Sequence, residues 1–128
     1  MLIDGHKFDL RIYVAVTSIN PLRVYVYDEG LARFASVRYD IDDTKNVYSH
    51  LTNYSINKKN HGKDTHENKW SLKKLREYLT NLKNTSKKAK KLDVDKLFAE
   101  IDSIVVKTMI SVEPLIWNSV QMFLPNTY

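Results

Sequence analysis

The 128-residue sequence contains no cysteine. Disulfide bridges, thiolate metal sites and cysteine nucleophiles are therefore excluded, and a reducing compartment fits best. Glycine occurs only at positions 5, 30 and 62, so neither a P-loop nor a glycine-rich dinucleotide fingerprint can be written. A nucleotide, if one is bound, has to be held by strands and loops instead.

Long apolar runs are also missing. No segment approaches the roughly eighteen apolar residues that a membrane span needs. The charged residues Asp4, Lys7, Asp9 and Arg11 interrupt the start of the chain, so we expect no signal peptide there. The four histidines show no metal-ligand spacing. We expect a soluble intracellular protein without a membrane segment.

What the sequence does contain is an ordinary globular composition with an uneven charge. Apolar residues make up 43% and charged residues 27%, which predicts one folded domain. Residues 57–91 hold twelve Lys/Arg against three Asp/Glu, within a chain of net charge +5. This segment is either a solvated linker or a surface that attracts an acidic protein. Nucleic acid is not expected as a partner, because aromatic residues do not alternate with the lysines.

Strand-forming residues dominate the first third of the chain. "DLRIYVAVTSI" (9–19) and "LRVYVYD" (22–28) are rich in β-branched and aromatic residues and flank a turn at Asn20-Pro21. Glu29-Gly30 then breaks the second run, and "LARFASV" (31–37) offers a third strand. The pattern predicts a meander of three antiparallel strands.

The rest of the chain favours loops and helices. Residues 38–69 lack periodicity and predict a long loop with a short helical turn near 42–47. Apolar spacing predicts a helix over 70–82 and, after the linker 83–91, a second helix over 94–112. Asp93 or Asp95 can cap the second helix, and Glu113-Pro114 should end it. The expected fold class is α/β (α+β), with an antiparallel meander followed by helices.

Two clusters of side chains are candidates for chemistry. Lys7, Asp9 and Arg11 alternate along the first strand, so all three project from one sheet face. That face is either solvated or the floor of a site for a phosphorylated ligand. Arg33 is either a surface residue with its stem on apolar neighbours or a second cation aimed into the same site.

The second cluster is the polar stretch "HLTNYSIN" (50–57). Thr52, Asn53 and Ser55 can satisfy the backbone of their own loop. Alternatively, they provide neutral hydrogen-bonding groups for sugar hydroxyls and phosphates, with His50 stacking or donating. The sequence spacing leaves both interpretations open.

Five ordered blocks resemble the tubulin tyrosine ligase-like family, whose members look like ATP-grasp carboxylate-amine ligases. The blocks are "LIDGHKFDLRIYV" (2–14), "VYVYDEGLARFAS" (24–36), "HLTNYSIN" (50–57), "KWSLKKLREYL" (69–79) and "IVVKTMISVEP" (104–114). The first two blocks look most like the glutamate-adding branch. The resemblance implies that this chain is a central fragment of an ATP-grasp fold.

The resemblance also implies roles for the candidate residues. Those implied to surround ATP are Lys7, Asp9, Arg11, His50, Thr52 and Asn53. Arg11 and Arg33 are the implied catalytic residues, which would stabilise charge on the transferred phosphoryl and acyl oxygens.

The implied reaction is ATP-dependent addition of free glutamate to glutamate side chains of tubulin tails. ATP would phosphorylate the acceptor γ-carboxylate, and the amine of the free amino acid would attack the resulting acyl phosphate. The basic segment would help to draw in the acidic tail. The resemblance implies a monomer in the cytoplasm, on the microtubule cytoskeleton, including the axoneme of cilia or flagella.

The chain departs from the family pattern at both ends. Residues 1–128 should form only part of the catalytic domain, without the earlier lobe whose lysines grip the α- and β-phosphates. The acidic strand with a Glu-x-Asn motif for Mg²⁺ is also missing, so no residue is assigned to metal. Glu67-Asn68 replaces the family's Gly-Ser before Lys-Trp. We therefore expect the isolated fragment to be inactive. The alternative is a non-catalytic module that binds acidic tubulin tails through residues 57–91.

Overall fold

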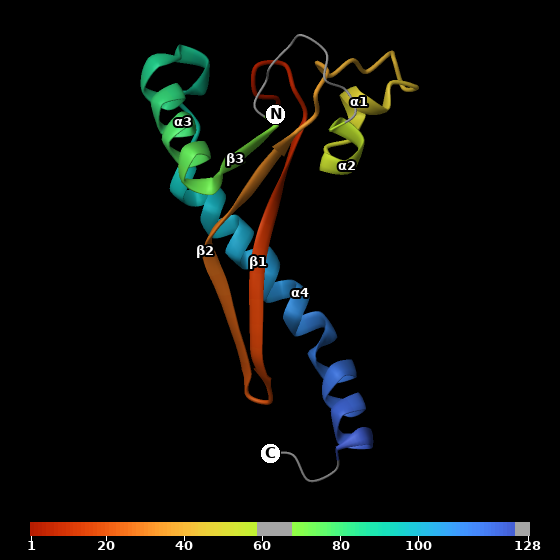
Figure 1. Ribbon diagram of the computed structural model, residues 1–128. Coiled ribbons are helices and arrows are strands. Elements are labelled where there is room, and N and C mark those ends of the chain that lie inside the picture. The colour runs from red at the N-terminus through yellow and green to blue at the C-terminus, as the bar shows by residue number, and fades with distance from the viewer. Residues whose placement is uncertain (59–67, 125–128) are drawn as a thin grey trace. The chain divides into compact units, whose positions relative to one another are not determined.

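The computed structural model describes residues 1–58 and 68–124. Its helices and strands appear in Figure 1. The strands are β1 (Phe8–Ile19), β2 (Leu22–Phe34) and β3 (Lys69–Ser71), and the helices are α1 (Val47–His50), α2 (Tyr54–Asn57), α3 (Leu72–Thr85), the 3₁₀ helix η1 (Lys87–Ala89) and α4 (Val94–Phe123). The chain forms two compact units, one of Met1–Ile12 with Asp28–Tyr78 and the other of Tyr13–Tyr27 with Leu79–Tyr128. Each unit is described by itself.

The three strands form one sheet in the order β1-β2-β3. This arrangement confirms the expected class, an antiparallel sheet followed by helices. The turn at Asn20-Pro21 also lies where the sequence predicts it. The predicted break at Glu29-Gly30 is wrong, because β2 continues through it to Phe34.

Gly30 allows two backbones to approach closely, and this explains why it lies inside a strand. A Cβ atom at this position would lie 2.3 Å from the carbonyl oxygen of Arg11 in the neighbouring strand. No side chain fits into that space, so glycine is required here by packing rather than by a turn.

The third strand of the sheet lies where the sequence predicts the end of a loop and the start of a helix. In β3, Ser71 pairs with Leu31 and Lys69 with Arg33, while Trp70 pairs with Ala32. The predicted helical stripe therefore starts too early, because Trp70 belongs to a strand that leads directly into α3. The Ser71 hydroxyl accepts a hydrogen bond from the Lys74 amide at 3.1 Å, which satisfies one free amide at the start of α3.

The core of the first unit consists of aromatic and small apolar side chains, which pack on the face of β2 opposite Arg33. The Phe34 ring lies 4.8 Å from the Trp70 ring and 5.6 Å from the Phe8 ring, between centroids. Among the described residues of this unit, the buried apolar ones are Ile3, Ala32, Phe34, Ala35, Trp70, Leu72 and Leu75. This packing anchors β3 against β2, and it thereby fixes the residues that β3 places on the other face.

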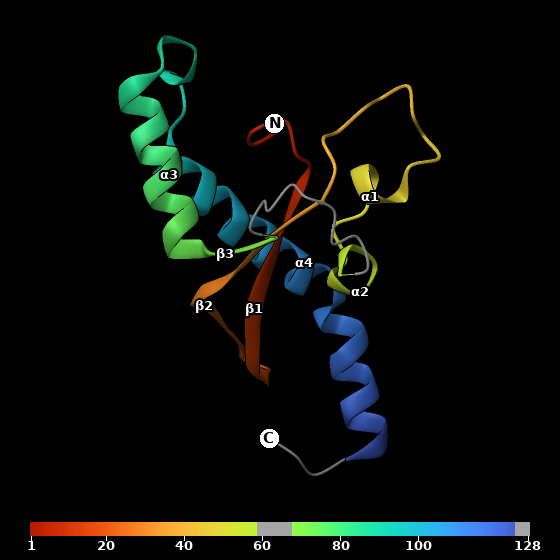
Figure 2. The ribbon, with the colours of Figure 1, turned by 45° about the horizontal axis from the view of Figure 1, so that its top comes forward.

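Two short helices occupy part of the predicted loop, and they lie close together in Figures 1 and 2. The helical turn expected near 42–47 is displaced, since α1 begins at Val47. The side chain of Asn46 caps α1 by accepting from the Tyr48 amide at 3.2 Å. Residues 59–67 of the predicted loop and basic segment lie outside the described residues.

In the second unit, α4 runs 30 residues. The Asp93 side chain caps it by accepting from the Lys96 amide at 3.0 Å, which confirms one of the two predicted caps. The predicted end at Glu113-Pro114 is wrong, because the helix continues to Phe123 with Pro114 inside it. A proline within a helix removes one amide donor, and the apolar residues after it sustain the helical spacing. Leu79, Val94 and Phe98 are the buried apolar residues described in this unit.

Candidate functional site

An ion pair joins the first two strands on the face that carries the predicted site residues. The Arg33 Nε donates to Asp9 Oδ1 at 3.0 Å, and the Arg33 Nη2 donates to Asp9 Oδ2. The two side chains are 26% and 38% exposed, so the pair lies in contact with solvent. A bidentate bond of this kind fixes the orientation of the guanidinium plane. The charge of Arg33 is therefore balanced within the chain, by a residue that the sequence also assigns to the site.

Lys7 connects the start of the sheet to the polar stretch. Its Nζ donates to the main-chain carbonyl of His50 at 2.8 Å. The His50 ring is held separately, with Nε2 bonded to the Asp43 carbonyl at 2.8 Å and the ring edge-on to Tyr39 at 5.2 Å between centroids. Because the carbonyl can only accept, His50 Nε2 carries the proton of this bond. His50 therefore contributes its backbone to Lys7, while its ring is engaged with the loop before α1.

The positions of the other predicted site residues, Arg11, Thr52 and Asn53, are set by the elements to which they belong. Arg11 is exposed and lies two residues after Asp9 on β1, so both project from the same sheet face. Asn53 occupies the N-cap position of α2, but its side chain makes no capping hydrogen bond. The exposed Asn53 amide therefore makes no capping hydrogen bond to its own helix. A hydrogen bond joins Lys7 to His50, and an ion pair joins Asp9 to Arg33. Arg11 follows Asp9 on β1, and Thr52 and Asn53 follow His50 in the chain.

Asn57 is a residue that the sequence interpretation missed. Its side chain is 1% exposed and makes four hydrogen bonds. Oδ1 accepts from the Ser36 amide at 2.8 Å and from the Ser36 hydroxyl at 2.6 Å. Nδ2 donates to the carbonyls of Leu51 at 2.8 Å and Asn53 at 3.0 Å. Asn57 therefore positions the loop that carries Thr52 and Asn53 against the end of β2. The only feature of the sequence that could indicate this role is the spacing of four residues between Asn53 and Asn57. This spacing does not show whether the Asn57 amide is buried or exposed.

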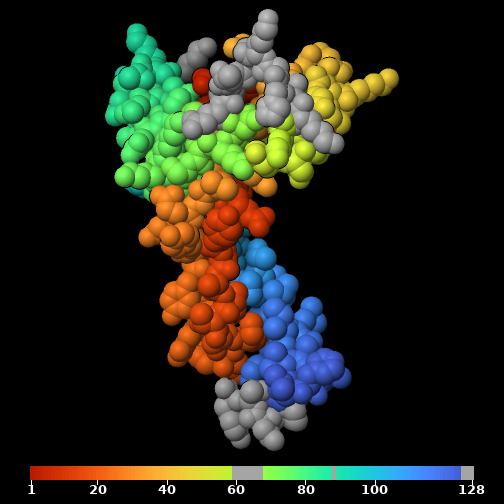
Figure 3. Space-filling view, in the orientation of Figure 1, coloured from red at the N-terminus to blue at the C-terminus, as the bar shows by residue number. Residues whose placement is uncertain are grey.

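Lys69 is the second residue that was missed, since the sequence places it at the end of a loop. Its Nζ lies 3.5 Å from the centre of the Tyr54 ring. Tyr54 is the first residue of α2 and follows Asn53 directly. In Figure 3 the yellow-green atoms of α2 adjoin the green atoms at the start of α3. The structure thus brings a further cation to the polar stretch from a strand 15 residues away in sequence.

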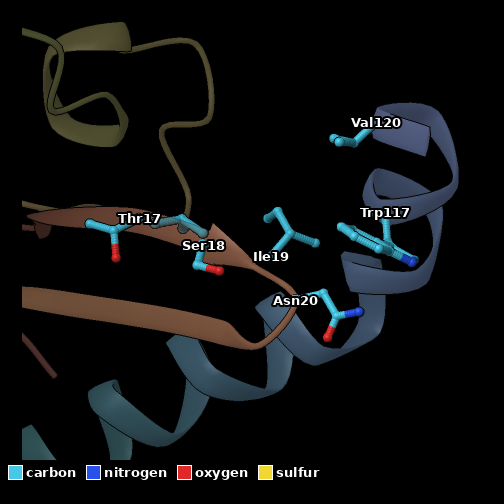
Figure 4. A pocket seen from close by; sticks show the side chains of 7 residues that line it. Thr17, Ser18, Ile19, Asn20, Trp117 and Val120 are labelled. Carbon is cyan, nitrogen blue, oxygen red and sulfur yellow. The ribbon is translucent and has the colours of Figure 1, made fainter. Parts of the chain in front are cut away.

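Two hollows lie elsewhere, both within the second unit. One, of about 280 Å³, is lined by Val16–Asn20 with Trp117 and Val120, and Figure 4 shows Trp117 beside Ile19 and Asn20. The other, of about 400 Å³, is lined by residues from Leu115 to Leu124 of α4. Neither lining contains a charged side chain. Neither hollow can therefore neutralise a phosphate or a carboxylate.

Residues 1–58 and 68–124 contain no group of three or more His, Asp or Glu side chains that could hold a metal ion. None of the helices in these ranges has the length and apolar character to cross a membrane.

Comparison of the sequence with known proteins places the chain in a family. A family model described as "Tubulin-tyrosine ligase family" matches residues 1–128. The chain is 41% identical to the tubulin monoglutamylase TTLL4 of Mus musculus over 99% of its length, 42% identical to the tubulin polyglutamylase TTLL6 of Homo sapiens over 98%, and 40% identical to the tubulin polyglutamylase TTLL5 of Homo sapiens over 98%. It covers 11%, 14% and 10% of those three proteins, respectively. The chain belongs to the tubulin-tyrosine ligase family.

Proposed function

We propose that this chain forms part of the ATP and substrate site of a ligase that adds glutamate to glutamate side chains of tubulin tails. The observation that carries the proposal is the joining of Lys7 to the His50 carbonyl beside the Asp9–Arg33 pair. Three chain segments that are distant in sequence thereby supply cations and a polar loop to one region. The names of the relatives, a tubulin monoglutamylase and two tubulin polyglutamylases, support glutamate and tubulin as substrates.

The residues present fit a nucleotide. Lys7, Arg11 and Arg33 offer positive charge for phosphate oxygens, and Arg33 is held in a fixed plane by Asp9. The exposed Asn53 amide, unused by its own helix, and the neighbouring Thr52 hydroxyl suit ribose hydroxyls and phosphate oxygens. Bound ATP would supply the phosphoryl group that makes the acceptor carboxylate reactive. Arg11 and Arg33 would then stabilise the negative charge that gathers on the transferred and acyl oxygens.

Magnesium does not fit the described residues in the same way, because they contain no carboxylate cluster. We therefore assign no residue of this chain to the metal. We propose that the metal ligands, and the lysines for the inner phosphates, belong to parts of the relatives that the chain does not span. Residues 1–128 alone are then a partial catalytic domain, and they should not incorporate glutamate into tubulin.

The proposal includes a cellular setting. The enzyme would act as a monomer in the cytoplasm, on microtubules and on the axonemes of cilia or flagella. Its partners would be tubulin tails and free glutamate, with neither nucleic acid nor a membrane involved.

A segment exchange tests the proposed function. Residues 1–128 would replace the matching segment of human TTLL6, and the product would be assayed for glutamate incorporation into tubulin with ATP. We expect activity within about tenfold of that of the parent enzyme. Arg33→Ala in this enzyme should lower the rate by about 10²-fold, a typical loss for one charge-stabilising group.

The matched control is Lys83→Ala, which removes a cation from the last turn of α3 and should leave the rate unchanged. If the exchanged enzyme is equally active with Arg33 and with alanine at that position, the proposed site is wrong. A folded enzyme that is inactive with the wild-type segment would also contradict the proposal.

A second candidate function is the docking of acidic tubulin tails without catalysis. Exposed cations favour it: Lys73, Lys74 and Arg76 lie on α3, and Lys87, Lys90 and Lys91 lie in and after η1. Such surfaces attract acidic peptides most strongly at low salt. Replacing Lys87, Lys88, Lys90 and Lys91 with glutamate should abolish binding of a glutamate-rich peptide while ATP binding is unchanged. Peptide binding that survives this charge reversal would exclude the second candidate.

A further inference from the structure

His6 is a buried titratable residue that the proposed chemistry does not use. The residue is 6% exposed, and its Nδ1 lies 2.9 Å from the main-chain oxygen of Ala35. Because a carbonyl oxygen can only accept, Nδ1 carries the proton of this bond and donates it. Ala35 is fully buried, so the bond forms away from water. The His6 ring therefore holds one defined peptide group just after β2.

A tight turn directs the His6 ring into the core. The main chains of Ile3 and His6 pair through two hydrogen bonds, at 3.2 Å and 2.8 Å, with Asp4 and Gly5 between them. Asp4 and Gly5 have φ angles of 49° and 80°, the left-handed conformation that Asp-Gly turns favour. Successive residues of an extended chain point to opposite sides. The buried His6 therefore leaves Lys7 on the exposed side.

Ala35 joins His6 to the residue that follows it in the chain. The Ala35 amide donates to the Lys7 carbonyl at 2.9 Å, while the Ala35 carbonyl accepts from the His6 ring. Two consecutive residues are thus fixed to Ala35, one by its side chain and the other by its main chain. A shift of the His6 ring would consequently move the main chain of Lys7.

The next residue, Ser36, extends the connection to the polar stretch. Its amide donates to Asn57 Oδ1 at 2.8 Å, and Asn57 Nδ2 donates to the Leu51 carbonyl at 2.8 Å. Lys7 Nζ completes a circuit by donating to the carbonyl of His50, the residue before Leu51, at 2.8 Å. A closed series of hydrogen bonds and chain segments therefore runs from the start of β1, through the residues after β2, to the polar stretch and back.

We propose that His6 is a positioning residue of this site, which sets the place of the Lys7 ammonium through Ala35. The inference rests on the proposed function, in which Lys7 offers its charge to a phosphate oxygen of ATP. A lysine ammonium stands on a flexible stem, so it binds an anion more tightly when the main chain beneath it is already fixed. Because its own side chain is buried, His6 acts on ATP only through Lys7.

The test uses human TTLL6 in which residues 1–128 replace the matching segment, and it measures kcat together with the KM for ATP and for glutamate. His6→Phe keeps a planar ring but has no donor for Ala35. His6→Asn places an amide nitrogen near the position of Nδ1 and should retain the bond. The matched control is Leu75→Ala, which removes a buried apolar side chain on α3 and lowers stability without removing a hydrogen bond. Thermal unfolding of each variant shows whether it is folded.

We expect His6→Phe to raise the KM for ATP by about tenfold, the loss that one displaced hydrogen bond to a charged group predicts. Both kcat and the KM for glutamate should stay within about twofold of the values with the wild-type segment, because weaker ground-state binding of ATP raises its KM alone. His6→Asn should restore the KM for ATP to within about twofold, since it keeps the donor. Leu75→Ala should leave this KM unchanged.

If His6→Phe does not fold, His6→Gln takes its place, because its amide nitrogen lies farther out, near the position of Nε2. A KM for ATP that is unchanged in the variant without the bond would overturn the inference. An equal rise in His6→Asn or in Leu75→Ala would overturn it too. In each of these cases, a rate that still falls with Arg33→Ala leaves the proposed function standing. A folded enzyme that is inactive with the wild-type segment would overturn both.

Discussion

The Asn57 side chain allows the most quantitative test of how the polar loop is built. Asn57→Ala removes four hydrogen bonds and leaves two donors of Ser36 and two carbonyls without this partner. Each bond of this kind contributes about 0.5–1.5 kcal/mol. Four such bonds together contribute about 2–6 kcal/mol. In the variant, water can replace some of the lost hydrogen bonds to Ser36 and to the two carbonyls, so we use the lower half of this range. We expect a loss of about 2–4 kcal/mol, a large fraction of the roughly 5–15 kcal/mol that stabilises a small domain.

Two further substitutions separate hydrogen bonding from shape. Asn57→Asp has nearly the same shape and keeps the acceptor for Ser36, but it places a carboxylate oxygen against the carbonyls of Leu51 and Asn53. This variant should be destabilised at neutral pH, and it should recover part of its stability in acid, because a protonated carboxyl can donate to one carbonyl. Ser36→Ala removes the hydroxyl bond to Asn57 and keeps the amide bond to it, and it should lose about 1 kcal/mol.

The assays are urea unfolding of each chain and amide hydrogen exchange in the native state. Unfolding gives the free-energy difference, and exchange should show that Leu51–Asn53 loses protection before the β2 strand does. If Asn57→Ala unfolds within about 0.5 kcal/mol of wild type, the four bonds do not hold the loop in the way described. A loss of protection spread evenly over the chain would equally refute the local role.

Three other predictions follow from single contacts. In a double-mutant cycle, Asp9→Asn and Arg33→Ala should show a coupling of only about 0.5–1 kcal/mol, because both side chains are partly exposed, and a coupling of zero would contradict the observed pair. Burial first, and then the charge of Asp4 and the hydrogen bond to it, raises the pKa of Tyr78 above its usual 10.0. The folded state therefore favours the protonated phenol, whose stabilisation is complete below pH 10.0 and is lost as pH rises through the raised pKa. Absorbance titration should show a late tyrosine step that Tyr78→Phe removes and that Asp4→Asn only lowers, and a step unaffected by Tyr78→Phe would refute this. Finally, Pro114→Ala should stabilise the chain by about 1–2 kcal/mol, because proline is unfavourable inside a helix, and no gain in urea unfolding would contradict a helix that continues to Phe123.

The sequence predicted those helices and strands for which several features of neighbouring residues indicate the same structure. Alternating β-branched and aromatic residues, together with a proline turn, identified β1 and the beginning of β2. The apolar spacing and Asp93 identified the start of α4. Family resemblance, carried by short ordered motifs, identified residues that the structure does join, namely Lys7 with His50 and Asp9 with Arg33.

The errors occurred where distant parts of the chain determine the conformation. The sequence predicts that Gly30 ends a strand. In the structure, Gly30 lies inside β2 because the Arg11 carbonyl on the neighbouring strand leaves no room for a side chain, and sequence alone does not reveal this contact. β3 is three residues long, and it is a strand only because it pairs with β2. The apolar spacing therefore predicts that Trp70 belongs to the following helix. Pro114 was given its usual meaning as a helix end, but the apolar spacing continues beyond it. The roles of Asn57 and Lys69 depend on tertiary contacts with Ser36, Tyr54 and Arg33, which no local pattern indicates.

The central claim is that the polar stretch and the charged strand face form one site for ATP. The most direct measurement is labelling of the chain with an acyl-phosphate derivative of ATP, which transfers its acyl group to lysines beside the bound phosphates. Mass spectrometry then identifies the modified lysines, with and without excess ATP. The account predicts that Lys7 is labelled strongly, that ATP suppresses this labelling, and that the exposed Lys83 and Lys87 react only weakly and without competition. Labelling that is uniform over the exposed lysines and insensitive to ATP would contradict it.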